Sequence, residues 1–342
     1  MRRLCDAAEV LGYVRALEYG LEKLRSGFPL SNRLLRDMHQ HLLSGARGEH
    51  TAPGEFRRTQ NWIGGSRPGN AHFVPPASVE KLTGAGLLSG NRCTQVEWAA
   101  QSGSPTVLRG VREANLSACD DFRTFSTVPP PPELVPDAMS DLEKFLHSED
   151  RRIGIIEKAA LAHVQFETIH PFLDGNGRLG RLLIALLMYH DKVLKDPALY
   201  VSLYFKTHRQ EYYTLLDRVR THSDWDAWIC FFARAVGSVA AQATDTARKI
   251  DELARTDRAR VPGLGRKSGS ALPVIEALLQ RPLTQIAEVT KATGLTPNTV
   301  AAALKSLTEL KITSEISGRQ RDRIFAYDQL MSIINEGMGP PE

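Results

Sequence analysis

One twelve-residue stretch, HPFLDGNGRLGR at positions 170–181, constrains the chain more than any other. Residues at amphipathic helical spacing lead up to it and end at Ile169. After it, leucines repeat at helical spacing from Leu179 to Leu187. The stretch therefore predicts a tight Gly-Asn-Gly turn that joins two helices and begins the second one.

The start of that second helix is expected to bind an anion. The first N–H groups of a helix have no partners within the helix, and the helix dipole adds positive potential there. Arg178 and Arg181 lie one turn apart, and each guanidinium suits phosphate oxygens. Asp174 offers a carboxylate for Mg²⁺ bridging phosphates. His170 is a candidate proton acceptor near neutral pH.

Each of these features also has a purely structural interpretation. A His-Pro pair is usually a turn and Gly-Asn-Gly is usually a loop, so either one alone is weak evidence for function. A base, a metal ligand, an anion site and two arginines within twelve residues are harder to explain as scaffold.

The stretch matches the motif H-x-F-x-D/E-G-N-G-R-x-x-R at every fixed position, and the chain resembles the Fic family, protein adenylyltransferase type. The resemblance implies a mainly α fold, a Fic helical bundle with a small β-hairpin flap. It also implies transfer of AMP from ATP, with Mg²⁺, to a Ser, Thr or Tyr hydroxyl of a target protein. His170 would then be the catalytic base and Asp174 the metal ligand. The residues implied in ATP binding are Gly175, Asn176, Gly177, Arg178, Leu179, Gly180, Arg181, Tyr212 and Tyr213.

Upstream of the motif we expect helices and then a flap. Residues 1–50 carry two apolar helical stripes and are predicted to form the N-terminal helical part of the fold, and residues 51–240 the Fic core. Residues 53–65 and 71–76 contain turn signals and resemble the family's flap, which docks the target by strand addition. The candidate target-facing residues are Arg57, Gln60, Asn61 and Trp62. For Trp62, anchoring of the hairpin is an equal alternative.

Residues 77–127 interrupt the family pattern. Val-Pro-Pro occurs at 74–76 and again at 128–130, and the residues between show no sustained period. We interpret this segment as an insertion beside the flap, where it would block or reshape the target groove while the fold survives. The alternative function is therefore a catalytically silent Fic scaffold that acts as a DNA-binding regulator.

Downstream of the flap, one histidine and a pair of tyrosines each have two possible interpretations. His163 lies on the apolar face of the helix expected over 153–169 and is interpreted as a core histidine rather than a catalyst. The resemblance places Tyr212 or Tyr213 beside the nucleoside, although aromatic residues at helical spacing usually belong to a core.

The C-terminal part is predicted to be a linker, 241–270, and a small domain, 271–335. Thr296 and Pro297 suit the N-cap and first position of a helix. The expected order of helix, helix, turn, helix and hairpin resembles a winged helix-turn-helix, which binds DNA with the helix after the turn. The candidate DNA-binding residues are Asn298, Thr299, Lys305, Arg319 and Arg321. A domain used only for protein contact is the alternative.

Composition limits the number of domains, the kinds of partner and the cellular location that we expect. A chain of 342 residues with 42% hydrophobic residues suits two or three globular domains, and a net charge of +4 permits nucleic-acid contact without arguing for it. Four separated cysteines argue against a disulfide framework or a zinc site. The sequence has neither a signal-peptide pattern nor an apolar run of membrane length, so we expect a cytoplasmic protein without a membrane partner. A homodimer is left open.

Overall fold

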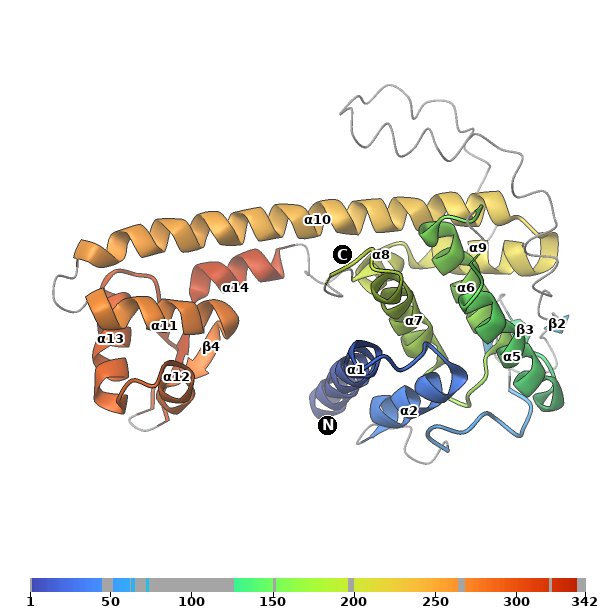
Figure 1. Ribbon diagram of the computed structural model, residues 1–342, viewed down its shortest axis with the longest axis horizontal. Coiled ribbons are helices and arrows are strands. Elements are labelled where there is room, and N and C mark those ends of the chain that lie inside the picture. Colours follow the sequence, from blue (N-terminus) through green and yellow to red (C-terminus); the bar gives the residue numbers. More distant parts are fainter. Residues whose placement is uncertain are drawn as a thin grey trace, which may run out of the picture. The chain divides into compact units, whose positions relative to one another are not determined.

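The computed structural model describes residues 2–44, 52–61, 63–64, 72–73, 126–149, 152–195, 200–263, 268–319 and 322–336. The chain divides into two compact units, Met1–Val239 and Ala240–Glu342, and the long helix α10 contributes to both (Figure 1). Within the described part of the chain, no helix combines the length and apolar character needed to cross a bilayer.

The first unit is built from helices, as the sequence predicted. They are α1 (Arg2–Arg25), α2 (Asn32–Leu43), the 3-10 turn η4 (Pro132–Leu134), α5 (Val135–Leu146), α6 (Ile155–Ile169), α7 (Asn176–His190), α8 (Val201–Thr207), α9 (Arg209–His222) and the first part of α10 (Trp225–Arg260). Helix α1 packs against α2 and α7, and α6 packs against α5 and α7. The molecule is therefore mainly α.

Helices α6 and α7 form the centre of this unit. Residues 159–169 of α6 are all buried, and so is every residue of α7 from Leu182 to Met188. Trp228 of α10 closes the core, and its Nε1–H donates to the Ala160 carbonyl at 3.0 Å. A helix that is apolar on all sides is stable only inside a core. The loop between α6 and α7 is thus held at both ends by rigid elements.

The flap region forms a small sheet of three strands among the described residues. These are β1 (Ile63–Gly64), β2 (His72–Phe73) and β3 (Ser126–Val128), in the order β1-β3-β2. Strand β1 is antiparallel to β3 and β2 is parallel to it, and both Ile63 and His72 lie opposite Thr127. The predicted hairpin was thus wrong in its pairing, because a distant segment supplies the central strand.

The strand β3 also changes one boundary of the predicted insertion. Ser126 and Thr127 were assigned to the inserted segment 77–127, whereas Ser126 pairs with β1 and Thr127 pairs with both flap strands. The rest of that segment lies outside the described residues.

The second unit combines helices with a second small sheet. Its elements after α10 are α11 (Ser268–Gln280), β4 (Leu283–Gln285), α12 (Ile286–Thr293), α13 (Pro297–Glu309), β5 (Ser314–Glu315), β6 (Ile324–Ala326) and α14 (Asp328–Asn335). The strands pair antiparallel in the order β4-β6-β5. Thr296 caps α13, as predicted, and its side chain accepts from the Thr299 N–H at 3.3 Å. Strand β4 and helix α14 were not predicted.

The linker predicted over 241–270 is wrong for residues 241–260, which continue α10 without a break. The sequence loses its apolar period there because most of these turns are exposed. Their Ala, Arg and Lys residues still favour a helix. An ion pair one turn apart, Asp245 with Lys249 at 2.9 Å, lies along it, and Ile250, Leu253 and Ala254 belong to the second unit's core or pack against it.

Candidate active site

The predicted turn begins at His170, which ends α6 in a left-handed backbone conformation. Its φ is 49° and its ψ is 59°, and its N–H donates to the Phe166 carbonyl at 3.0 Å. This conformation is uncommon for a residue with a side chain and is often found at functional sites. The chain reverses here, so the His170 side chain lies at the end of a buried helix.

The imidazole of His170 has the properties of a neutral base. Its Nδ1 is buried and has no hydrogen-bond partner among the described residues. Burial, followed by the positive charge of Arg220, lowers the pKa of His170 to about 3, whereas the Glu167 carbonyl acts to raise it. The ring is therefore unprotonated at neutral pH and retains a lone pair for proton transfer.

Arg220 of α9 holds the end of α6. Its Nε donates to the Thr168 hydroxyl at 3.1 Å and its Nη2 to the Glu167 carbonyl at 3.2 Å. Burial lowers the pKa of Arg220. The guanidinium thus brings positive charge into the interior beside the base.

Arg57 occupies a different place from the one expected. It is 3% exposed, its Nε donates to the His170 carbonyl at 2.9 Å, and its Nη2 donates to the Ile169 carbonyl at 3.3 Å and to the Pro130 carbonyl at 2.5 Å. A side chain used in this way is not available to face a target protein. We interpret Arg57 as a clamp that joins the flap segment to the loop at His170.

The other predicted flap residues lie nearer the surface. Gln60 donates from Nε2 to the Pro129 carbonyl at 2.8 Å, and Asn61 donates from Nδ2 to the Leu173 carbonyl at 3.2 Å. Asn61 therefore lies beside the loop that carries the motif. Trp62 is outside the described residues.

Asp174 precedes α7 with its carboxylate partly in solvent. Oδ1 accepts from the Gly175 N–H at 2.6 Å, and Oδ2 lies 3.5 Å from Nη2 of Arg178. The Asp174 side chain is 49% exposed, so it retains room for a further partner.

The predicted anion site corresponds to the first turn of α7. Gly175 is the N-cap, with a φ of 81° that favours glycine. The Leu179 N–H makes the bond to the Gly175 carbonyl, at 3.0 Å. This is the first hydrogen bond within α7. The N–H groups of residues 176–178 come before it and therefore have no carbonyl partner within the helix. Leu179 itself is buried in the core.

The Asn176 side chain is committed to the loop. It is 2% exposed; its Oδ1 accepts from the Phe172 N–H at 2.9 Å, and its Nδ2 donates to the Phe172 carbonyl at 2.7 Å. Asn176 was expected to contact phosphate with its side chain as well as its backbone. With the side chain occupied, only its backbone N–H is left for that purpose.

The two arginines of the motif lie one turn apart at the start of α7, as their spacing predicted. Nη1 of Arg178 is buried and has no partner among the described residues. Nη1 of Arg181 is 3.3 Å from the position that a Cβ would take on Gly177. Both guanidinium groups are therefore close to the anion site.

Tyr212, proposed above for the nucleoside, belongs to the core. It is 4% exposed, and its hydroxyl lies 2.9 Å from Nε2 of His163. Nδ1 of His163 faces the Gly180 carbonyl at 3.0 Å, so this nitrogen carries the proton and Tyr212 donates to Nε2. The interpretation of His163 as a core histidine agrees with this geometry. Tyr213 is partly buried, and its ring lies edge-on to Tyr212 at 5.0 Å.

Three residues near the motif were not singled out from the sequence: His39, Glu167 and Arg220. His39 of α2 donates from Nε2 to the Asp174 carbonyl at 2.9 Å, accepts from the Gly54 N–H at 2.8 Å, and stacks on Phe172. The sequence feature that could have identified such residues is a polar side chain on an otherwise apolar helix face, as for His39 beside Met38 and Leu42. Such residues mark buried polar contacts but do not name the partner.

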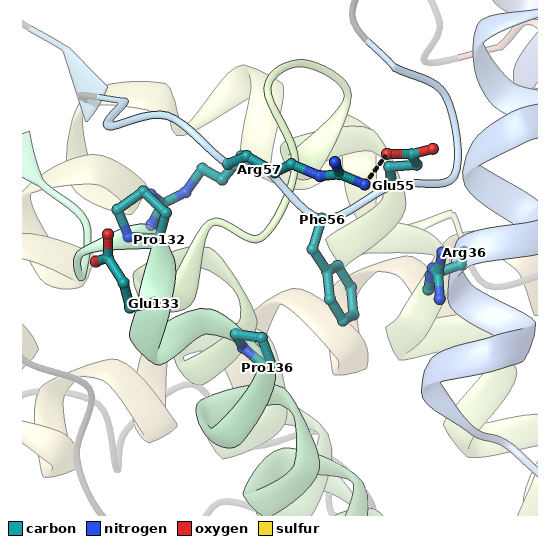
Figure 2. A pocket seen from close by; sticks show the side chains of 8 residues that line it. Arg36, Glu55, Phe56, Arg57, Pro132, Glu133 and Pro136 are labelled. Carbon is teal, nitrogen blue, oxygen red and sulfur yellow. Dashed lines mark hydrogen bonds and ion pairs between the residues drawn. The ribbon is translucent and has the colours of Figure 1, made fainter.

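A separate surface pocket of about 440 Å³ lies between α2, the 55–58 segment and the start of α5 (Figure 2). Its lining residues are Arg36, Glu55, Phe56, Arg57, Arg58, Pro132, Glu133 and Pro136. Phe56 is near the centre of the view, and Glu55 pairs with Arg58 at 3.1 Å. None of the motif residues 170–181 lines this pocket, so it is separate from the predicted phosphate site.

The predicted DNA-binding residues lie on α13 and after β5. Asn298 and Lys305 are exposed on α13, whereas Thr299 is partly buried and its hydroxyl lies 2.8 Å from that of Thr296. Arg319 is exposed, and Arg321 is outside the described residues.

Comparison with known proteins bears directly on this loop. Residues 94–188 match the Fic/DOC family, and the matched range contains α6, the His170 loop and most of α7. The chain contains a Fic domain. The matched range begins within the segment interpreted as an insertion.

Curated relatives of the Fic domain carry the name protein adenylyltransferase. "Probable protein adenylyltransferase aq_aa38" of Aquifex aeolicus is 39% identical over 66 residues, 19% of this chain and 20% of that protein. Protein adenylyltransferase fic-1 of Caenorhabditis elegans is 44% identical over 61 residues, 18% and 12% of the two chains. Protein adenylyltransferase Fic of Nematostella vectensis is 40% identical over 109 residues, 31% and 24% of the two chains. The chain thus spans at most about a quarter of these relatives.

Solved structures with similarity to this chain include two Fic proteins. One is a Fic family protein from Desulfovibrio desulfuricans G20, with 18% identity, 92% of this chain and 74% of that chain covered, and a TM-score of 0.45. The other is Fic-1, residues 134–508, from C. elegans, with 20% identity, coverage of 70% and 52%, and a TM-score of 0.44.

Proposed function

We propose that the chain is a protein adenylyltransferase that transfers AMP from ATP to a Ser, Thr or Tyr hydroxyl of a target protein. The observation that carries the proposal is a small cluster of buried polar atoms without partners among the described residues, His170 Nδ1 and Arg178 Nη1, both near one loop. Buried polar atoms are normally paired, so such a cluster indicates a polar ligand. The names of the relatives support the same activity.

In this reaction His170 takes the proton of the acceptor hydroxyl. The hydroxyl oxygen attacks the α-phosphorus, a new P–O bond forms, and the bond to pyrophosphate breaks. The N–H groups of residues 176–178 hold phosphate oxygens, and Arg178 and Arg181 offset the charge towards the β- and γ-phosphates. The protein therefore contributes position and charge more than covalent chemistry.

The residues present fit Mg²⁺ bound together with the nucleotide. Mg²⁺ in nucleotide sites is commonly held by one or two carboxylates and by substrate phosphates. Asp174 is half-exposed beside the anion site, and the described residues contain no group of three His, Cys, Asp or Glu that would hold a metal ion unaided. Asp174 would hold the ion, which when bound would neutralise phosphate charge.

Two substitutions test these assignments by separating catalysis from binding. His170→Ala removes the base, so labelling of protein by ATP should fall by roughly 10²–10⁴-fold, while ATP affinity measured by calorimetry should change little. Asp174→Ala should weaken ATP binding in Mg²⁺ but not in EDTA. Labelling by His170→Ala at the parent rate would contradict the role of His170. ATP binding by the parent without any labelling would favour the silent scaffold.

We also propose a second role for the C-terminal unit, DNA binding through α13 in the manner of a winged helix-turn-helix. The feature that favours it is the exposed face of α13, which presents Asn298 and Lys305 beyond a capped turn. Residues 268–336 contain seven Lys or Arg and seven Asp or Glu, so this stretch has no net charge that would attract DNA.

Titration of duplex DNA with the full chain at increasing salt tests this second role. We expect the parent chain to bind DNA at low salt. The double variant Lys305→Ala, Arg319→Ala should bind more weakly, and its affinity should depend less steeply on salt concentration. Lys158→Ala, on α6, is the control and should leave binding unchanged. Absence of binding at low salt would point to protein contact instead.

A further inference from the structure

Glu167 carries a buried carboxyl group that the proposed reaction does not use. The residue lies on the last turn of α6 and is 7% exposed. Its Oε1 is inaccessible and has no hydrogen-bond partner among the described residues. An unpaired buried carboxyl group lowers stability, so its presence here calls for a functional reason.

The carboxyl group points at the first turn of α7. Oε1 of Glu167 lies 2.5 Å from the position that a Cβ would take on Gly180, so a side chain at position 180 would displace the carboxyl group. The corresponding Cβ position on Gly177 lies 3.8 Å from the same Oε1 and 3.3 Å from Nη1 of Arg181. The carboxyl group and the Arg181 guanidinium therefore lie on the same side of Gly177, each within 4 Å of one point beside it and without an ion pair between them.

Charge connects the same two groups. Burial raises the pKa of Glu167, whereas Arg181 and then Arg220 act to lower it. The Arg220 guanidinium already donates to Thr168 and to the Glu167 carbonyl. Of these two arginines, Arg181 is therefore the one whose guanidinium the Glu167 carboxylate can orient.

We propose that Glu167 is a positioning residue whose carboxylate directs Arg181 towards the β- and γ-phosphates of the nucleotide. This inference rests on the proposed function, because it takes the α7 start as the phosphate site. The inference predicts that removal of the carboxylate charge weakens the binding of ATP but not of AMP, because AMP lacks the phosphates that Arg181 would contact.

A double-mutant cycle on nucleotide affinity tests the inference. Glu167→Gln keeps the shape of the side chain and should weaken ATP binding about tenfold, with AMP affinity nearly unchanged. In an Arg181→Ala background the same substitution should have no further effect on ATP. Glu157→Gln, the same exchange on the first turn of α6, is the control and should leave both affinities unchanged.

Each outcome bears on the inference. Equal losses for Glu167→Gln with and without Arg181, or equal losses for ATP and AMP, would assign Glu167 to the fold alone and overturn it. If Glu167→Gln does not fold, Glu167→Met replaces it in the same cycle, since an apolar side chain suits the buried position. If the parent chain binds no ATP, the proposed function fails and this inference fails with it.

Discussion

At the scale of single residues, Asn176 shows how the motif sets the phosphate loop. Both polar atoms of its side chain bond to the backbone of Phe172, four residues earlier. The loop is therefore closed on itself before α7 begins. In the proposed anion site the Asn176 side chain sets the shape of the loop, and the backbone N–H groups of residues 176–178 are the proposed donors.

Replacement of Asn176 by Ala should destabilise the Fic domain as well as reduce ATP affinity. The change leaves the buried N–H and carbonyl of Phe172 without these partners, which costs about 1–3 kcal/mol for each lost bond. Thermal unfolding and calorimetry with ATP measure the two effects. Asn298→Ala, at an exposed position on α13, is the control. A loss of ATP affinity at unchanged stability would mean that the Asn176 side chain contacts phosphate directly.

The motif predicted which residues meet at this loop but not what every side chain does there. His170, Asp174, Arg178 and Arg181 are adjacent because sequence spacing on a turn and a helix determines their positions. Arg57 was misjudged because it reaches carbonyls more than a hundred residues away along the chain. Such contacts depend on tertiary packing, which local sequence does not encode.

At the scale of elements, α6 carries two histidines that remain uncharged in the folded chain. Burial is the largest cause that lowers the pKa of His163, to about 3, and the same is true of His170. In the unfolded chain an imidazole has a pKa near its ordinary value of about 6.5. As the pH falls below that value, these histidines bind protons in the unfolded state but not in the folded state. The free energy of unfolding therefore falls between pH 6.5 and 3.

The Fic domain should therefore lose stability in acid in proportion to its buried histidines. His163→Gln removes one of them, so the difference in unfolding free energy between parent and variant should shrink by about 1.4 kcal/mol per pH unit below pH 6. Burial raises the pKa of Glu167, which acts in the opposite direction in both proteins and cancels in the comparison. Urea unfolding at several pH values measures the difference. Parallel curves would show that His163 does not stay neutral when folded.

Helices with a strong apolar period were predicted well, and α10 shows where that signal ends. The central helices α6 and α7 bury nearly every side chain, so their apolar residues identify them without ambiguity. The second half of α10 buries few side chains, so its pattern resembled a linker. Strand β3 was missed for another reason: its partners β1 and β2 are distant in sequence, and no local pattern predicts such pairing.

At the scale of the whole molecule, two units with separate cores are joined through one helix, and the proposed chemistry belongs to the first of them. The proposed base, metal ligand and anion site all lie between Ile169 and Arg181. The second unit contributes the exposed face of α13 to the second proposed role. The two proposed activities are therefore separable by substitution.

The proposed reaction transfers the α-phosphate of ATP, and not the γ-phosphate, to protein. Incubation of the full chain with a cell lysate, Mg²⁺ and ATP labelled at either position tests it most directly. We predict labelled protein only with the α-label, lost in His170→Ala. Protein labelled from the γ-position and not from the α-position would show phosphoryl transfer and contradict the account.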